Sequence, residues 1–237
     1  MEGKQGEIMQ RIRKICVYLL LLTLLFMSTA YAHLPYDGQT PIDCGDHSVP
    51  AQIVKEAPKI LIIGDSISIG YTYDLKDMLP KYTIYHNPCN AAHTRNGLKK
   101  IDFWLAQEQE WDVVVFNFGI WDANKFYKIS LQEYGENLEK IARKIKAKSR
   151  HILFVTTTAV PVNSPDPLVN SEIAYNNTGI KIMKNLGIEA FDLHEVSSLI
   201  PYLHLNPEKQ NDVHYLPEGY QVLASQIAMQ ILAILKR

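Results

Sequence analysis

The chain has 237 residues, of which 47% are hydrophobic and 21% are charged, and its formal net charge is −1. This composition is that of an ordinary globular protein and excludes a disordered or repetitive chain. A charge so close to neutral gives no electrostatic reason to bind nucleic acid, so we expect no nucleic-acid partner.

The first 32 residues have the pattern of a signal peptide. Basic side chains precede an apolar stretch over residues 15–27, and Ala30-Tyr31-Ala32 follows as a small-x-small cleavage site. The stretch is short for a transmembrane helix, which needs about 20 residues, although an uncleaved anchor is the competing interpretation. We therefore expect a periplasmic or secreted protein with no stable membrane insertion after cleavage.

Residues 33–58 are rich in Pro, Asp and Gly and show no sustained periodicity, so we expect an irregular N-terminal segment packed on the surface. One of the 3 cysteines, Cys16, lies in the signal peptide. An exported protein can pair the remaining two, and a Cys44–Cys89 disulfide is favoured over two free thiols.

From residue 59 onward, short β-rich segments alternate with longer helical ones, the pattern of a parallel α/β sheet. We expect strands near 59–64, 82–86, 112–118, 151–157 and 188–192, and helices near 70–79, 96–108, 131–148, 170–186 and 217–236. Asp112–Phe116 and residues 151–155 are continuous apolar runs, as strands covered on both faces require. The sequence thus predicts one domain over residues 59–237, with a mostly parallel five-stranded sheet between helical layers.

The first predicted strand runs into the segment Gly64-Asp65-Ser66-Ile67-Ser68. Ligands of an open parallel sheet bind beyond the carboxyl ends of the strands, so Ser66 stands where a nucleophile would act. Gly-Asp-Ser is also ordinary turn chemistry, and the segment taken alone does not separate the two interpretations.

A serine hydroxyl needs a base to take its proton, and histidine is the usual base. Among 8 histidines, His214 stands in a loop that opens directly into the last predicted helix, where Pro217 suits the first turn. Asp212 is close enough in sequence to orient the imidazole ring. The alternative is an exposed loop histidine, but Ser66 in the first turn favours a catalytic triad of Ser66, His214 and Asp212.

These segments resemble the first and last blocks of the SGNH (GDSL) hydrolases, and the resemblance spans residues 59–236. It implies a flavodoxin-like α/β/α sandwich, with Ser66 as nucleophile and His214 as general base. The commonest family spacing would put the aspartate at the position of Asn211, so Asp212 is the favoured acid and a Ser66–His214 dyad the alternative. Family members hydrolyse or transfer acyl groups on substrates from lipids to acetylated sugars.

The third block of the family differs here in a residue of the oxyanion hole. Gly119-Ile120-Trp121-Asp122 places Trp121 where the family usually has an asparagine amide. We expect Asn117 to supply the missing donor, with a polar strand cap as its alternative role, and Trp121 to shape the substrate pocket.

The second block also differs, because residues 90–95 lack the usual glycine that donates a backbone N–H. We expect the N–H of Ala92 or His93 to join that of Ser66 in the oxyanion hole, with a substrate contact as the alternative role of His93. Asn90 and Thr94 are assigned to the pocket region, where they hold the loop or line the substrate site.

The histidines, cysteines and carboxylates have no metal-ligand spacing, and the sequence has no glycine-rich phosphate loop, so we expect neither a metal nor a cofactor. The resulting prediction is an exported monomeric serine esterase that hydrolyses acyl esters, acetyl esters among them, of carbohydrate or lipid. An O-acyltransferase acting on envelope glycans and a catalytically degenerate glycan-binding protein are the alternatives.

Overall fold

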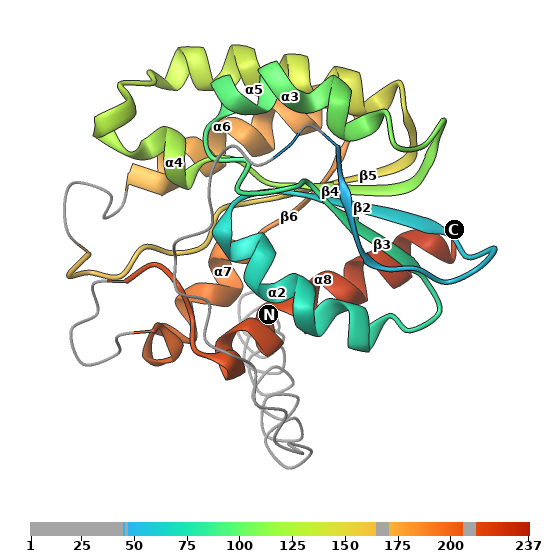
Figure 1. Cartoon of the computed structure of the whole chain (residues 1–237). Coiled ribbons are helices and arrows are strands. Elements are labelled where there is room, and N and C mark those ends of the chain that lie inside the picture. Colours follow the sequence, from blue (N-terminus) through green and yellow to red (C-terminus); the bar gives the residue numbers. More distant parts are fainter. Residues whose placement is uncertain (1–44, 46, 165–170, 206–211) are drawn as a thin grey trace, which may run out of the picture. The chain divides into compact units, whose positions relative to one another are not determined.

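A six-stranded sheet forms the centre of the structure (Figure 1). The computed structural model describes residues 45, 47–164, 171–205 and 212–237. The strand order is β1-β3-β2-β4-β5-β6, with β1 Val49–Gln52, β2 Lys59–Ile63, β3 Thr83–His86, β4 Trp111–Phe116, β5 Ser149–Val155 and β6 Glu189–Phe191. The pairs from β3 to β6 are parallel, and β1 is antiparallel to β3.

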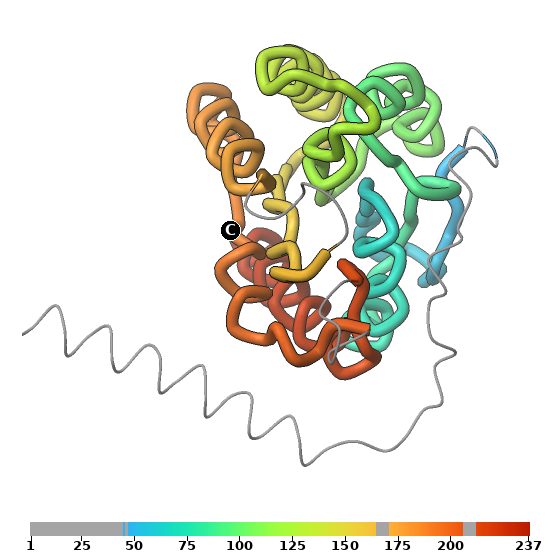
Figure 2. Tube along the Cα trace, turned by 90° about the vertical axis from the view of Figure 1, so that its left-hand side faces the viewer, coloured from blue at the N-terminus to red at the C-terminus, as the bar shows by residue number. Residues whose placement is uncertain are grey.

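Helices cover both faces of this sheet. They are α2 (Ser66–Met78), α3 (Thr94–Leu105), α4 (Ile120–Ala123), α5 (Leu131–Lys146), α6 (Ser171–Leu186), α7 (Leu193–Ser198) and α8 (Pro217–Leu235), with 3-10 turns η1 (Lys125–Tyr127) and η2 (Pro201–Leu203). Figures 1 and 2 both show α3, α5 and α6 on one face and α2 and α8 on the other. The predicted three-layer α/β/α sandwich is therefore confirmed.

Strand β2 shows why its sequence is apolar without alternation. Ile60 and Ile62 pack into the core under α2 and α8, while Leu61 and Ile63 pack into the core under α3 and α5. All four side chains are 0% exposed. A central parallel strand is buried on both faces, so every position of β2 favours an apolar residue.

The sheet has one strand more than predicted, because β1 forms within the segment expected to be irregular. Val49 pairs with His86 and Pro50 with Tyr85, after which the register shifts before Gln52. Proline is tolerated on an edge strand, where its missing N–H faces away from the neighbouring strand. Such a short, mostly exposed strand has no alternating pattern by which the sequence would reveal it.

Three predictions concern residues that lie wholly or partly outside the described ranges. The signal peptide over residues 1–32 is one, and Cys44 of the expected disulfide is another. Cys89 lies within the described ranges and is disulfide-bonded and buried. The third is the uncleaved-anchor alternative; in the ranges that the structure describes, no helix is long and apolar enough to cross a membrane.

The turn from β2 into α2 is very short, which makes Ser66 the first residue of the helix. Asp65 is the N-cap, and its Oδ1 accepts a hydrogen bond of 2.9 Å from the backbone N–H of Ile67. A Cβ at Gly64 would lie 2.7 Å from Ser68 Oγ, so only glycine fits this turn without displacement. The helix consequently begins four residues earlier than the predicted range near 70–79.

Candidate active site

The structure brings Ser66, His214 and Asp212 together, although Ser66 and His214 are 148 residues apart in sequence. His214 Nε2 lies 2.9 Å from Ser66 Oγ, and His214 Nδ1 lies 2.7 Å from Asp212 Oδ1. A carboxylate only accepts hydrogen bonds, so Nδ1 carries the proton and Nε2 presents its lone pair to the serine hydroxyl. This is the hydrogen-bond order by which a histidine removes the proton of a nucleophilic serine.

Hydrogen bonds between residues 203–205 and residues 214–216 fix the backbone around His214. The His214 carbonyl accepts a hydrogen bond of 2.8 Å from the N–H of Leu205, and Leu216 N–H donates to the Leu203 carbonyl at 2.8 Å. The buried His204 donates from Nδ1 to the same His214 carbonyl at 3.2 Å and stacks on Tyr215 with ring centroids 4.3 Å apart. His204 is a positioning residue that the sequence pattern did not single out.

Asp65, next to the nucleophile, is 2% exposed and acts as a buried helix cap. Burial raises the pKa of Asp65 to about 6, while the hydrogen bond from the Ile67 N–H and the nearby His214 act in the opposite direction. Its carboxyl faces the helix rather than the imidazole contact, so Asp212 is the acid paired with His214. An aspartate directly before the first helical residue is the sequence signal for this cap.

Two backbone N–H groups, those of Ser66 and His93, are the candidates for binding a developing oxyanion. The N–H of Ser66 is the first donor of α2 and has no intrahelical partner. Within the described part of the chain, the structure gives the N–H of His93 no hydrogen bond, whereas Ala91 N–H donates to the Gly64 carbonyl at 2.9 Å. The hydrogen bond from Ala91 to Gly64 holds the loop of His93 against the turn that carries Ser66.

Ala92 N–H is already used inside the loop, since it donates to Asn90 Oδ1 at 2.8 Å. Ala92 has φ of 54°, a left-handed conformation that explains why glycine is usual in this block. Of the two candidates proposed from sequence, His93 therefore has the N–H that is free to bind a ligand. Asn90 is 3% exposed, which fits a role in holding the loop.

Thr94 is also internal, at 0% exposure, and Asp122 is its partner. Both oxygens of Asp122 accept from the Thr94 backbone N–H, at 3.0 and 3.1 Å, and Oδ1 lies 2.5 Å from Thr94 Oγ1. Burial raises the pKa of Asp122 to about 7, although the Thr94 hydroxyl opposes that rise. Asp122 thus ties the third block to the second, a role that the sequence analysis missed.

Asn117 and Trp121 occupy different environments. Asn117 Nδ2 donates to the Val155 carbonyl at 2.8 Å, which leaves the second amide hydrogen as a possible oxyanion donor and also fits the alternative role of a strand-end cap. Trp121 is half-buried in α4, with its ring centroid 5.5 Å from that of Tyr127. The tryptophan is thus part of a surface group of aromatic rings.

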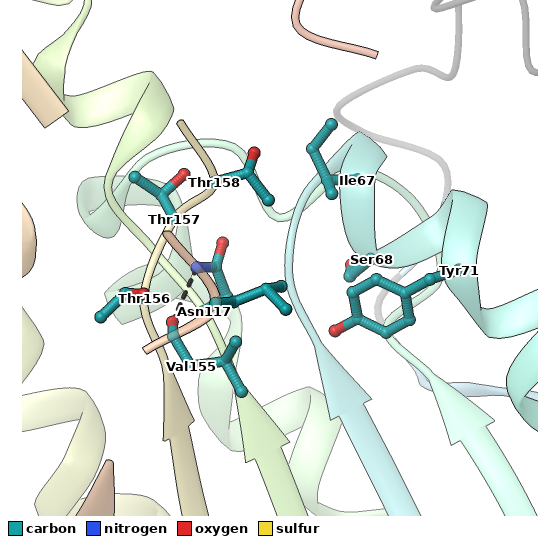
Figure 3. A pocket seen from close by; sticks show the side chains of 9 residues that line it. Ile67, Ser68, Tyr71, Asn117, Val155, Thr156, Thr157 and Thr158 are labelled. Carbon is teal, nitrogen blue, oxygen red and sulfur yellow. Dashed lines mark hydrogen bonds between the residues drawn. The ribbon is translucent and has the colours of Figure 1, made fainter. Parts of the chain in front are cut away.

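A small cavity lies between α2 and the carboxyl ends of β4 and β5 (Figure 3). Its volume of about 10 Å³ is roughly what one water molecule needs. Figure 3 shows Tyr71 directing its hydroxyl toward the strand ends, opposite Asn117. The lining residues are Ile67, Ser68, Tyr71, Asn117, Val155, Thr156, Thr157, Thr158 and Leu193.

A second serine–histidine contact lies below the first but is not accessible. His86 Nε2 is 2.7 Å from Ser68 Oγ, and both residues are buried. Burial lowers the pKa of His86 to about 4, so its ring is neutral near pH 7. Ser66 is the more exposed of the two, at 6% against 1% for Ser68, and the histidine that it contacts is paired with a carboxylate.

Known structures provide a comparison for this arrangement, whereas neither the protein-family models nor the curated proteins match the chain. The chain is similar to a carbohydrate acetylesterase from Sinorhizobium meliloti (TM-score 0.61, 16% identity), covering 75% of this chain and 99% of that one. An aryl esterase from M. smegmatis gives a TM-score of 0.60 at 13% identity, with 75% and 100% covered. An acetylxylan esterase from Geobacillus stearothermophilus gives 0.59 at 20% identity, with 75% and 96% covered.

The chain therefore has the fold of these esterases. The fold that the resemblance to the SGNH (GDSL) hydrolases implied is therefore confirmed. At 13% to 20% identity, the likeness establishes the fold alone, and the chemistry has to be argued from this chain's own residues.

Proposed function

We propose that the protein is an exported serine esterase that hydrolyses short acyl esters of carbohydrates through an acyl-enzyme intermediate. The observation that carries the proposal is the 2.9 Å contact between Ser66 Oγ and His214 Nε2, with Asp212 on the other ring nitrogen. The esterase fold of the similar structures supports the same class of reaction.

In the first half-reaction, His214 Nε2 takes the hydroxyl proton of Ser66 while Oγ bonds to the ester carbonyl carbon. The resulting oxyanion accepts hydrogen bonds from the backbone N–H groups of Ser66 and His93, a stabilisation that contributes several kcal/mol in related chemistry, on the order of 3. The tetrahedral intermediate then collapses, the bond to the alcohol oxygen breaks, and His214 gives its proton to the leaving alcohol.

In the second half-reaction, His214 removes a proton from water, and the water oxygen bonds to the acyl carbon of the acyl-serine. Collapse of this second intermediate releases the carboxylic acid and returns the proton to Ser66 Oγ. Asp212 keeps the Nδ1 proton in place throughout and stabilises the imidazolium that forms twice per cycle.

We assign an acetyl group to the acyl side of the ester. The carbohydrate acetylesterase and the acetylxylan esterase among the similar structures support this assignment. The small cavity has no part in it, because Ser66 is not among the residues that line it and Ser68, which does line it, is buried.

The decisive test is covalent labelling with a fluorophosphonate probe, followed by mass mapping of the modified residue. We expect labelling at Ser66 and its loss in the Ser66→Ala variant, together with at least a ~10³-fold loss of p-nitrophenyl acetate hydrolysis. The internal control is Ser68→Ala, because the Ser68 hydroxyl contacts His86 and not His214. A folded protein that does not label at Ser66 would support the glycan-binding alternative.

Product analysis separates hydrolysis from transfer. Incubation of an acetyl donor with and without a glycan acceptor is expected to give acetate as the main product in both cases. If acetyl-glycan dominates when the acceptor is present, the protein is the O-acyltransferase considered above. Export is tested separately by determining the N-terminus of the mature protein, which we expect at residue 33.

A further inference from the structure

Four aromatic side chains, His93, Trp121, Phe126 and Tyr127, lie together next to the candidate active site, and we call them the aromatic platform. Tyr127 is central, with ring centroids 4.8 Å from His93, 5.5 Å from Trp121 and 5.2 Å from Phe126. Phe126 is 79% exposed, and the other three are half-buried. A single exposed phenylalanine needs no explanation, but a group of four rings at a candidate site points to a ligand.

The platform is held rigidly by the surrounding polar contacts. Arg95 donates from Nη1 to the Tyr127 carbonyl at 3.1 Å and also pairs with Glu133. Asn124 Oδ1 accepts from the Phe126 N–H at 2.9 Å, and Tyr175 donates to the Ile129 carbonyl at 2.8 Å. A fixed backbone that presents an exposed ring reduces the ordering entropy that a ligand would have to overcome.

The platform is also continuous with the reacting groups. Its first ring belongs to His93, and Ala91 of the same loop donates its N–H to the Gly64 carbonyl beside Ser66. Trp121 precedes Asp122, whose carboxylate accepts a hydrogen bond from the N–H of Thr94, the residue after His93. The rings therefore start at the loop that is bonded to the Ser66 turn, whereas the small cavity lies between α2 and β5.

We propose that the aromatic platform binds a pyranose ring on the alcohol side of the ester, specifically a β-linked sugar whose ring substituents are equatorial. Such a sugar has one face made of axial C–H groups, which carry small positive charges and suit the negative face of an aromatic ring. The assignment to the alcohol side rests on the proposed function, because the loop next to the platform is bonded to the turn that carries the attacking Ser66.

The chemistry of the platform favours a sugar over a lipid. Tyrosine, tryptophan and histidine combine a ring face with a polar edge that can bind sugar hydroxyls. The segment also carries Lys125 and Lys128, both exposed, on either side of Phe126 and Tyr127. An acyl-chain groove would instead need a continuous apolar surface.

Tryptophan fluorescence can measure this binding without any catalysis. The chain has 3 tryptophans, of which Trp104 and Trp111 are 2% and 0% exposed, so Trp121 alone is positioned to respond to a surface ligand. We would titrate the Ser66→Ala protein with cellotriose and xylotriose, neither of which carries an ester. We expect a saturable shift or quenching of Trp121 emission with at least one of them, and no change with sorbitol.

Phe126→Ala tests the assignment to the platform, and Phe103→Ala is the matched control. Phe103 is an exposed phenylalanine on α3, at 46%, outside the four rings. Loss of one ring contact is expected to weaken sugar binding about 2- to 10-fold in Phe126→Ala and to leave the Phe103→Ala midpoint unchanged. The ratio of kcat/KM for an acetylated β-xyloside to that for ethyl acetate should fall by a similar factor in Phe126→Ala.

The outcomes separate this proposal from the proposed function. Saturable sugar binding that weakens in Phe126→Ala supports the platform even if Ser66 fails to label. Ester hydrolysis without sugar binding, or equal effects of the two phenylalanine variants, would overturn the platform and leave the esterase intact. A Trp121 response to phosphatidylcholine vesicles with none to either sugar would assign the platform to lipid instead.

Discussion

At the residue scale, one carboxylate oxygen contacts both the backbone and the ring of His214. Asp212 Oδ1 accepts from both the His214 backbone N–H, at 2.9 Å, and the ring Nδ1, at 2.7 Å. One oxygen thus fixes the turn and the ring tautomer together. Asp212 and His214 are two residues apart in sequence, so their contact is local. We expect it to survive small movements of the sheet.

Asp212→Asn is therefore expected to lower kcat far more than it changes KM. An amide nitrogen facing Nδ1 favours the wrong tautomer, in which Nε2 carries a proton and no longer accepts from Ser66. Loss of this kind has cost up to about 10⁴-fold in other serine hydrolases, and we expect 10²-fold or more, roughly, here. Steady-state hydrolysis of p-nitrophenyl acetate measures it. Activity within about threefold of wild type would favour the Ser66–His214 dyad instead.

Asp122 serves a different purpose, since it holds the loop that carries His93. Asp122→Ala leaves the buried Thr94 N–H without an acceptor, and we expect a loss of about 1–3 kcal/mol in the free energy of unfolding. Urea denaturation measures this loss. Asp102→Ala is the control, because that carboxylate is 67% exposed in its pair with Lys144 and should change stability by less than about 1 kcal/mol. Equal losses in both variants would argue against the loop-holding role.

At the element scale, α2 is positioned by its contact with α8. Gly70 lies against the Tyr220 ring so closely that an added Cβ would be 2.2 Å from it. The absence of a side chain at Gly70 lets the helix that begins at Ser66 approach the helix that follows His214. The packing of two helices thus sets the distance between nucleophile and base.

Gly70→Ala is expected to destabilise the fold by about 1–3 kcal/mol, because the Tyr220 ring must leave its position. It should also reduce kcat, since α2 and α8 shift relative to each other. Gly135→Ala on α5 is the matched control: the nearest atoms to its Cβ would be 3.4 Å away, and the change should be neutral or stabilising. Unfolding curves and kcat measurements on both variants test these expectations. A Gly70→Ala protein as stable as wild type would contradict the packing argument.

The long elements could be predicted from sequence because their periodicity is strong. Helix α5 was expected over 131–148 and spans Leu131–Lys146, and the continuous apolar runs became β4 and β5. Strand β1 could not be predicted, because its pairing with β3 depends on residues far along the chain and its own four residues include Pro50. Helix α4 is a single turn whose length is below any useful period.

The candidate site shows the same division. Ser66, Asp212 and His214 were identifiable because each belongs to a short local motif. The contact of Asp122 with Thr94 spans 28 residues and joins α4 to the start of α3, and that of His204 with His214 spans 10. Neither has a local pattern, because the contact depends on how separate loops pack after the sheet has formed. The N-cap role of Asp65 did have a local signal, which the predicted helix start at residue 70 overlooked.

At the scale of the whole molecule, buried titratable groups give stability a pH dependence of two opposing parts. His86 has its pKa lowered to about 4 by burial, so the stability it contributes is present above about pH 6.5 and is lost as pH falls through 4. Asp65 and Asp122 have pKa values raised by burial to about 6 and about 7, so their contribution is present below about pH 4 and is lost as pH rises through those values.

The stability of the His86→Gln variant should therefore depend on pH through Asp65 and Asp122, without the contribution of His86. Between about pH 7 and about pH 5, the free energy of unfolding of the variant is expected to rise relative to that of wild type by roughly 2 kcal/mol, because the penalty for protonating His86 is gone. Urea unfolding at the two pH values measures this difference of differences. An identical pH dependence in the two proteins would show that folding does not shift the pKa of His86, which contradicts the argument from burial.

The antiparallel strand β1 has a consequence for how the sheet meets other molecules. Without it, β3 would be the outer strand of a parallel sheet, with the backbone groups of four buried residues open to any passing strand. An open edge of this kind templates intermolecular pairing, whereas the opposite edge, β6, has only three residues and offers little to pair with. Detachment of the four residues of β1 would thus expose β3 as a site of self-association. We expect a protein that lacks the residues up to 52 to lose solubility under conditions in which its remaining soluble fraction keeps its esterase activity.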